Sequence, residues 1–208
     1  MIIAWVVFFI MLLMSVVVHE VSHGMVAALL GDPTARRLGR LTLNPIVHLD
    51  LVGSVVVPLA MLLMHSPVWF AWAKPVPVNV SYLRNPVSDM MWIALAGPLS
   101  NISLAFLGGL GLHLFRMVVG PIPEWAGVVG FQFVALNLGL AVFNLLPIPP
   151  LDGSRILVRF LPVTWRVSMV KVEPYGIGIL LALSFFNVLT PVVSGIKGML
   201  LPWFIYGI

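Results

Sequence analysis

The 208-residue chain has no cysteine, and only 9% of its residues are charged. The absence of cysteine excludes a disulfide framework and any thiolate metal site, and it leaves the redox compartment undetermined. Soluble domains usually carry about a quarter charged residues, so this scarcity of charge argues against a soluble protein. The net charge of +4 is small and scattered along the chain, which does not indicate a nucleic-acid partner.

Hydrophobic residues instead make up 61% of the chain, and its mean hydropathy is +1.10. We therefore expect an all-α, multi-pass protein of the cell membrane, with the lipid bilayer as its surroundings and about five to six hydrophobic segments. No repeat or linker divides the chain, so residues 1–208 are expected to form one domain. The apolar runs cover residues 2–30, 51–73, 91–119, 126–146 and 175–208.

Three of these runs have features that bear on the topology. The first has no basic residues before it and is too long for the core of a signal peptide, so we expect a retained helix. Pro58 and a further proline interrupt the run 51–73, which predicts a bent or re-entrant segment. The run 175–208 contains Pro191 and Lys197, and the pattern does not decide between one kinked helix and a pair.

Basic residues predict the orientation in the membrane. Nine of the eleven Lys and Arg residues lie in three connections, at 36–40, 74–84 and 155–171. Basic connections usually face the cytoplasm, so we expect these three inside and the N-terminus outside. The segments 36–45 and 74–83 are short and rich in turn formers and β-branched residues, which predicts strand-like elements at the cytoplasmic face.

The first apolar run contains "SVVVHEVSHG" at residues 15–24. His19 and His23 are four residues apart, so on a helix they share one face and can bind one metal ion. Glu20 is placed to act as the acid/base toward a water that the metal acidifies. The alternative is a chance trio on a polar helix face, but polar groups in a membrane helix cost several kcal/mol unless something compensates.

The depth of the histidines can be estimated from the helix rise. If Ile2 lies near the outer boundary, His19 lies about 26 Å further along a helix that rises 1.5 Å per residue. The hydrocarbon core is about 30 Å thick, which predicts a site near the cytoplasmic face.

A zinc site of this kind needs a third protein ligand and one open position. Asp152, in "FNLLPIPPLDGSR" at 143–155, follows a proline-broken helix and is either a helix cap or a ligand. His48 and Asp50 are its rivals, although a loop histidine and a turn aspartate explain them as well. His65 and His113 have no acidic neighbour and are expected to be interfacial or packing residues. The residues alone leave the third ligand open.

Three motifs carry a resemblance to a known family. "HEVSHG", "AGPLSN" (96–101) and "NLLPIPPLDG" (144–153), in this order on three hydrophobic segments, resemble the site-2 protease family of intramembrane zinc metalloproteases. The stretches at 31–50 and 72–79 are similar to its small members, which lack an inserted PDZ domain. The similarity extends to about Arg155.

The resemblance implies roles for individual residues. His19, His23 and Asp152 would bind one Zn²⁺, and Glu20 would be the catalytic acid/base. Asn144 would hold the substrate backbone or the developing oxyanion. Asn101 would likewise contribute to the substrate site and would also support close helix packing there. Without the resemblance, an asparagine in a membrane helix is equally well explained by an interhelical hydrogen bond.

The sequence thus predicts an intramembrane zinc endopeptidase that cleaves transmembrane segments of other membrane proteins. The strand-like segments would pair with the unwound substrate, because members of the family use such segments in this way. Two alternatives remain: a zinc transporter, in which the histidines and Asp152 form a transit site, and a catalytically idle membrane scaffold. A transporter has no need for Glu20 as a base.

Overall fold

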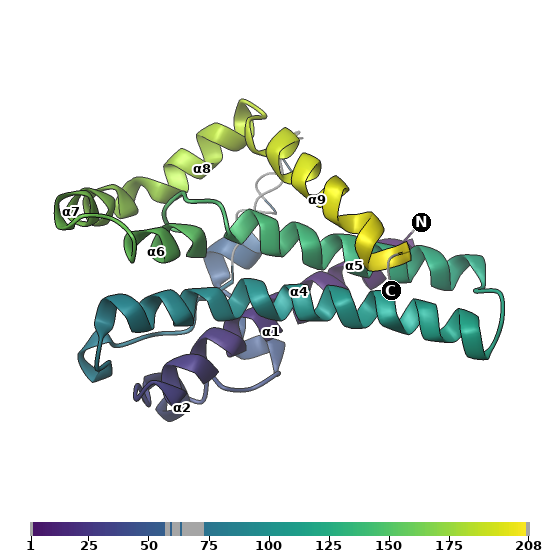
Figure 1. Cartoon of the computed structure of the whole chain (residues 1–208), viewed down its shortest axis with the longest axis horizontal. Helices are drawn as coiled ribbons and strands as arrows, with labels where there is room; N and C mark the ends of the chain where they lie inside the picture. The colour runs from purple at the N-terminus through teal and green to yellow at the C-terminus, as the bar shows by residue number, and fades with distance from the viewer. Residues whose placement is uncertain (1, 57–58, 60–62, 64–72, 207–208) are drawn as a thin grey trace.

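The computed structural model describes residues 2–56, 59, 63 and 73–206, and the secondary structure in these ranges consists of helices joined by turns and loops (Figure 1). Four helical stretches are long and apolar enough to cross a membrane, which supports a multi-pass membrane protein. They cover Ile3–Leu29, Pro86–Val118, Glu124–Asn144 and Val163–Phe185, and a shorter apolar helix covers Leu189–Ile205.

Helix α1 (Ile2–Leu29) confirms the predicted first helix almost to the residue. It ends where Gly31 adopts a positive φ of 111°, a conformation that costs a glycine little. There the backbone N–H of Asp32 donates to the carbonyl of Ala27 and that of Gly31 to Ala28, which satisfies two carbonyls at the helix end. A short helix, α2 (Thr34–Arg37), follows directly.

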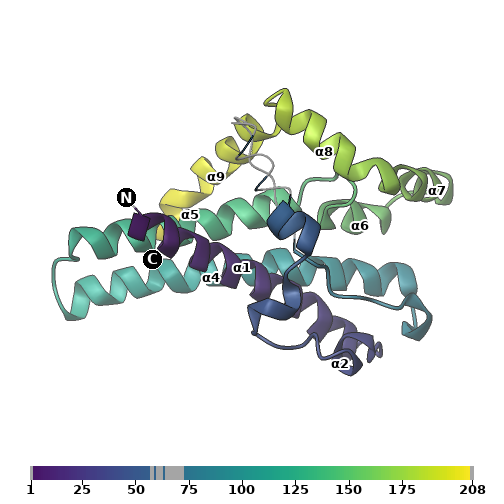
Figure 2. The same cartoon turned by 180° about the vertical axis from the view of Figure 1, so that it is seen from behind.

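Helices α4 (Pro86–Val118) and α5 (Glu124–Asn144) form a long antiparallel hairpin, and α1 crosses it (Figure 2). Ala105, Val134 and Leu138 are fully buried between α4 and α5 and pack against partly buried residues of α9 (Leu189–Tyr206). The three helices α1, α4 and α5 are in mutual contact, so polar groups on their facing sides are shielded from lipid.

The second half of the chain runs through α6 (Asp152–Val158), α7 (Val163–Val172), α8 (Gly176–Phe185) and α9. The question left open for residues 175–208 is answered by two helices, α8 and α9, which meet at an angle (Figure 1). Asn187, with φ 54°, ends α8. Two backbone bonds close this end, from Val188 N to Leu183 O and from Asn187 N to Ser184 O, the pattern of a Schellman cap.

Some expectations are not confirmed. The described residues contain no strand, and residues 36–45 and 74–83 form instead short helical turns and extended chain. The segment 74–79 is extended, but its backbone groups bond to side chains and a loop carbonyl, and the described part of the chain places no partner strand beside it, as a ladder would require. The count of five to six segments stays a prediction, because most of 57–72, including Pro58, lies outside the described residues.

Candidate metal centre

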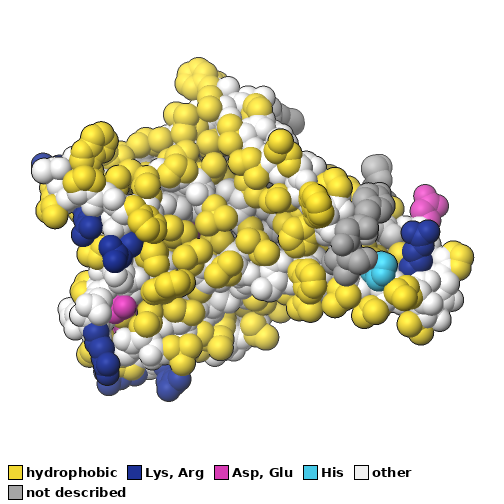
Figure 3. Space-filling model, viewed as in Figure 1, with side chains coloured by type: hydrophobic (Ala, Val, Ile, Leu, Met, Phe, Trp, Pro, Cys, Tyr) yellow, Lys and Arg dark blue, Asp and Glu magenta, His cyan; other side chains and the backbone are white. Residues whose placement is uncertain are grey.

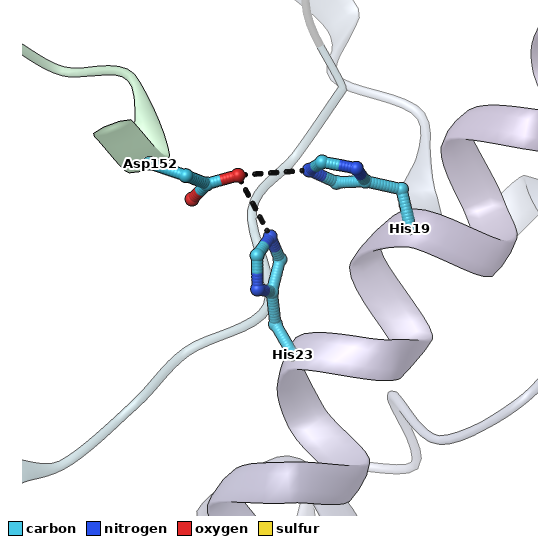
Figure 4. A group of neighbouring side chains, drawn as sticks. All are labelled: His19, His23 and Asp152. Carbon is cyan, nitrogen blue, oxygen red and sulfur yellow. Dashed lines mark ion pairs between the residues drawn. The ribbon is translucent and has the colours of Figure 1, made fainter. Parts of the chain in front are cut away.

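His19 and His23 lie one turn apart on α1 and point toward Asp152 at the start of α6 (Figure 4). The Oδ2 atom of Asp152 is 3.1 Å from Nε2 of His19 and 3.3 Å from Nε2 of His23. One ligand atom from each of the three residues lies within 4.8 Å of the others. The structure therefore brings both histidines of the first motif and the aspartate of the third motif together in one cluster.

The proline-rich loop before α6 explains how Asp152 reaches this position. After α5 ends at Asn144, turn-like backbone bonds link Ile148 N to Leu146 O and Leu151 N to Ile148 O, so the chain reverses within a few residues. Asp152 is then the first residue of α6. A Cβ atom on Gly153 would overlap the backbone carbonyls of Leu145 and Leu146, so only glycine allows α6 to begin this close to the end of α5.

Both histidine rings are held through their other nitrogen. Nδ1 of His23 lies 2.6 Å from the carbonyl oxygen of Ile93, and Nδ1 of His19 lies 2.7 Å from Oδ1 of Asn101. A backbone carbonyl can only accept, so His23 carries its proton on Nδ1 and presents the lone pair of Nε2 to Asp152. Metal-binding histidines are usually oriented by such a bond on the far ring nitrogen.

The donor set fits a zinc ion. Oδ2 of Asp152 is buried and accepts no hydrogen bond within the described part of the chain, although two ring nitrogens are close to it. Ligand atoms around a tetrahedral zinc, with bonds of about 2.0–2.1 Å, are about 3.3 Å apart, close to the two distances above. Lone pairs at this separation repel unless a cation lies between them. Two imidazoles and one carboxylate also leave the fourth position open.

Gly97, within the motif "AGPLSN", is a further residue of the site, and no role was predicted for it from the sequence. A Cβ atom there would lie 2.5 Å from ring atoms of both His19 and His23. Helix α4 can therefore approach the two rings only because this position has no side chain. The signal in the sequence was the pair of small residues, Ala96 and Gly97, that precedes Asn101.

Glu20 lies beside this cluster but outside it, and its carboxylate is held by the segment 74–79. Oε2 of Glu20 accepts a 2.9 Å hydrogen bond from the backbone N–H of Val76. Arg40 fixes the same segment, because its guanidinium donates to the carbonyls of Val47, Lys74 and Pro75. The backbone N–H of Lys74 in turn donates to the carbonyl of His48 at 2.8 Å.

Asp32 anchors the far end of this segment. Its carboxylate, fully buried, accepts from the backbone N–H of Asn79 and from both the N–H and the hydroxyl of Thr34. Burial raises the pKa of Asp32, but these hydrogen bonds and the charge of Arg37 outweigh it, so the pKa lies below its ordinary value. Asp32 is therefore charged at neutral pH and ties the end of α1 to Asn79.

The rival ligands lie elsewhere. His48 is buried, with 1% of its surface exposed, and its Nε2 is 2.9 Å from the carbonyl of Thr42. Asp50 accepts from the backbone N–H of Gly53 and so caps the helical turn Leu51–Val56. Neither belongs to the metal cluster found among the described residues. His113 lies on α4 and is not part of the metal cluster found among the described residues, and His65 lies outside the described residues.

The two asparagines predicted at the substrate site lie in different surroundings. Asn101 is completely buried, and its amide contacts His19, Asn137 and the carbonyl of Ser15. Asn144, at the last turn of α5, is partly exposed and donates through Nδ2 to the carbonyl of Leu140. A substrate-binding role stays a prediction for both.

Comparison with known proteins gives matches to one group. Residues 113–187 match the model of a family described as Peptidase family M50. The chain is 37% identical over 180 residues to "Putative zinc metalloprotease YwhC" of Bacillus subtilis (strain 168), which covers 83% of this chain and 77% of that protein. It is 29% identical over 197 residues to "Putative zinc metalloprotease Rip2" of Mycolicibacterium smegmatis, and the match covers 92% of this chain and 70% of that protein. No solved structure matches.

Proposed function

The chain belongs to peptidase family M50, the site-2 proteases, and on this basis we propose that residues 1–208 form an intramembrane zinc endopeptidase domain that cleaves transmembrane segments of other membrane proteins. The proposal assigns His19, His23 and Asp152 as the zinc ligands. It assigns Glu20 as the acid/base.

The observation that carries the proposal is the meeting of Asp152 with the two histidines. A zinc ion held there would act as a Lewis acid toward the scissile carbonyl and would acidify a water molecule. The chain supplies three ligand atoms for it, and the bonds of the two Nδ1 atoms orient the rings. A buried position beside helices α4 and α5 also keeps bulk water from the site.

Glu20 supports the proteolytic part of the proposal. Its Oε2 is occupied by the N–H of Val76, so Oε1 is the oxygen on which a proton can be taken up and passed to the leaving amine. The N–H of Val76 stabilises the carboxylate and holds its orientation. Asn144 has a second N–H on Nδ2 besides the one that bonds to Leu140, and this N–H suits a substrate carbonyl or the developing oxyanion.

The distribution of charge supports an orientation with the N-terminus outside. Lys and Arg side chains gather at the end of the molecule where α2 and α7 lie (Figure 3). Helix α1 begins toward the opposite end, which also holds the connection between α4 and α5 (Figure 2). The positive-inside rule then puts the basic end in the cytoplasm.

The direct test is cleavage of membrane-spanning peptides by the purified protein in detergent or lipid, with and without a chelator. Proteolysis should require zinc and should be absent in Asp152→Ala. A zinc transporter would bind the metal and leave every peptide intact. A protease should show zinc-dependent cleavage in the wild type, and Asp152→Ala should lose this cleavage even when zinc is added. This result would separate the protease from the transporter and the idle scaffold.

A further inference from the structure

We propose that Asn137, which lies outside the three sequence motifs, is a positioning residue for the metal centre. Through Asn101 it determines which ring nitrogen of His19 carries the proton, and so keeps Nε2 free for the metal. The inference rests on the proposed function in one respect, that His19 is a zinc ligand.

A chain of hydrogen bonds connects three helices at this point. On α5, Nδ2 of Asn137 donates to the carbonyl of Phe133 at 3.0 Å. Oδ1 of Asn137 accepts from Nδ2 of Asn101 on α4, also at 3.0 Å. Oδ1 of Asn101 lies 2.7 Å from Nδ1 of His19 on α1. Both asparagines are 0% exposed, so no solvent competes for these groups.

The direction of every bond follows from the first one. The carbonyl of Phe133 can only accept, so the NH₂ group of Asn137 faces it and the amide oxygen faces Asn101. Asn101 must then present its NH₂ group to Asn137 and its oxygen to His19. An amide oxygen can only accept, so the proton of His19 sits on Nδ1 and the lone pair on Nε2.

The two histidines differ in what fixes them. The partner of His23 is the backbone carbonyl of Ile93, which cannot exchange donor for acceptor. The partner of His19 is a side-chain amide, which could rotate by half a turn and present NH₂ instead of oxygen. The proton of His19 would then move to Nε2, where a metal has to bind. Asn137 opposes this rotation, because it would bring two amide oxygens together in a buried site.

One other group acts in the same direction. Nδ2 of Asn101 also lies 3.4 Å from the carbonyl of Ser15, a longer contact than the one to Asn137. Loss of Asn137 should therefore weaken zinc binding without abolishing it. Partners of metal ligands typically change affinity by about 10- to 100-fold, and we expect a change in this range.

The test compares three variants of the full chain in detergent. Asn137→Leu keeps the branched shape of the side chain, with somewhat larger volume, but removes both the amide oxygen and the NH₂ group. Leu138→Ala is the matched control, because Leu138 is its neighbour on α5, is 1% exposed, packs with Ala105 and Val134 and, as an apolar side chain, forms no hydrogen bond to the amides. His19→Ala reports whether His19 binds zinc at all. Where Asn137→Leu does not fold, Asn137→Ala removes the same groups.

Zinc affinity is measured by competition with a chelator, and thermal stability in parallel. We expect Asn137→Leu to lose about 10- to 100-fold in zinc affinity, while Leu138→Ala loses stability and keeps its affinity. A second readout uses the zinc-loaded protein labelled with ¹⁵N-histidine. In Asn137→Leu, the Nδ1–H of His19 should exchange with solvent faster, whereas that of His23 should be unchanged.

The failures can be told apart. Unchanged zinc affinity in His19→Ala contradicts the proposed function itself. Loss in His19→Ala together with wild-type affinity in Asn137→Leu overturns only the role of Asn137. Equal losses in Asn137→Leu and Leu138→Ala, with His19 and His23 affected alike, would show that packing of α5 and not the amide chain controls the site.

Discussion

The backbone N–H of Val76 donates a 2.9 Å hydrogen bond to Oε2 of Glu20, and this bond joins the first motif to the extended segment 74–79. The segment is held in turn by side chains that are distant in sequence, above all Arg40. The position of Glu20, the proposed acid/base, therefore depends on how this segment is held.

Glu20→Gln should keep zinc and remove proteolysis. The glutamine amide oxygen can still accept from Val76, so the local structure is retained, but it cannot take up a proton. The expected loss in kcat is at least ~10²-fold, the scale of general acid–base catalysis. Metal content by mass spectrometry and cleavage of a membrane-spanning peptide check it. Cleavage at the wild-type rate would remove Glu20 from the mechanism.

Arg40→Lys should lower the rate without loss of zinc. The planar guanidinium donates to carbonyls from two separate loops, of Val47 and of Lys74 and Pro75, and one ammonium group cannot span them. Displacement of Val76 would then disturb Glu20, and misplaced catalytic groups cost about 10- to 100-fold in rate. Arg36→Lys, at an exposed position of α2, is the matched control. Equal kcat values for the two variants would contradict the role of Arg40.

These contacts show which parts of the site could be predicted from sequence. The spacing of His19 and His23 predicts a shared helix face, because helical geometry is local. The choice of Asp152 as their partner depended on the family resemblance, since residues far apart in sequence can meet in many ways. The contacts of Arg40, Val76 and Asn137 could not be predicted, because they depend on how separate segments pack.

The third ligand is tested by a pair of substitutions. Asp152→Ala removes the carboxylate whose Oδ2 faces both histidines, so zinc affinity should fall by more than about 100-fold, beyond the usual effect of an outer partner. His48→Ala should leave zinc bound, because His48 contacts Thr42 instead. Metal analysis of the two purified proteins decides the matter. Full zinc in Asp152→Ala with loss in His48→Ala would reverse the assignment.

Gly97→Ala tests how tightly α4 approaches the rings. The added methyl group would lie 2.5 Å from ring atoms of His19 and His23, so either the rings rotate or α4 moves away. We expect zinc affinity and proteolysis to fall together. Gly111→Ala, on the same helix, is the control, because a Cβ there meets no atom within 4 Å. Wild-type zinc affinity in Gly97→Ala would show that the close approach is not required.

The fold was predictable to a similar, limited degree. The long first helix follows from its continuous apolar run and from Gly31 at its end. The break between α8 and α9 had a signal, Asn187 followed by Pro191, because asparagine tolerates the left-handed conformation that ends a helix. The strand-like segments were not confirmed, because β-branched composition predicts extended chain but cannot supply the neighbouring strand.

The last prediction concerns orientation, which the arrangement of helices does not settle because both ends of the molecule carry some charge. Helix α2, which contains Arg36 and Arg37, and helix α7, which contains Arg166 and Lys171, lie at one end of the molecule, and the connection between α4 and α5 lies at the other (Figure 1). The native chain has no cysteine, so single cysteines report on each end without background.

We expect Arg37→Cys to be protected from an impermeant thiol reagent in intact cells and labelled after lysis. Pro121→Cys, in the opposite connection, should be labelled in intact cells. The reverse pattern would put the N-terminus in the cytoplasm and the metal centre near the outer face, since His19 lies toward the α2 end of α1.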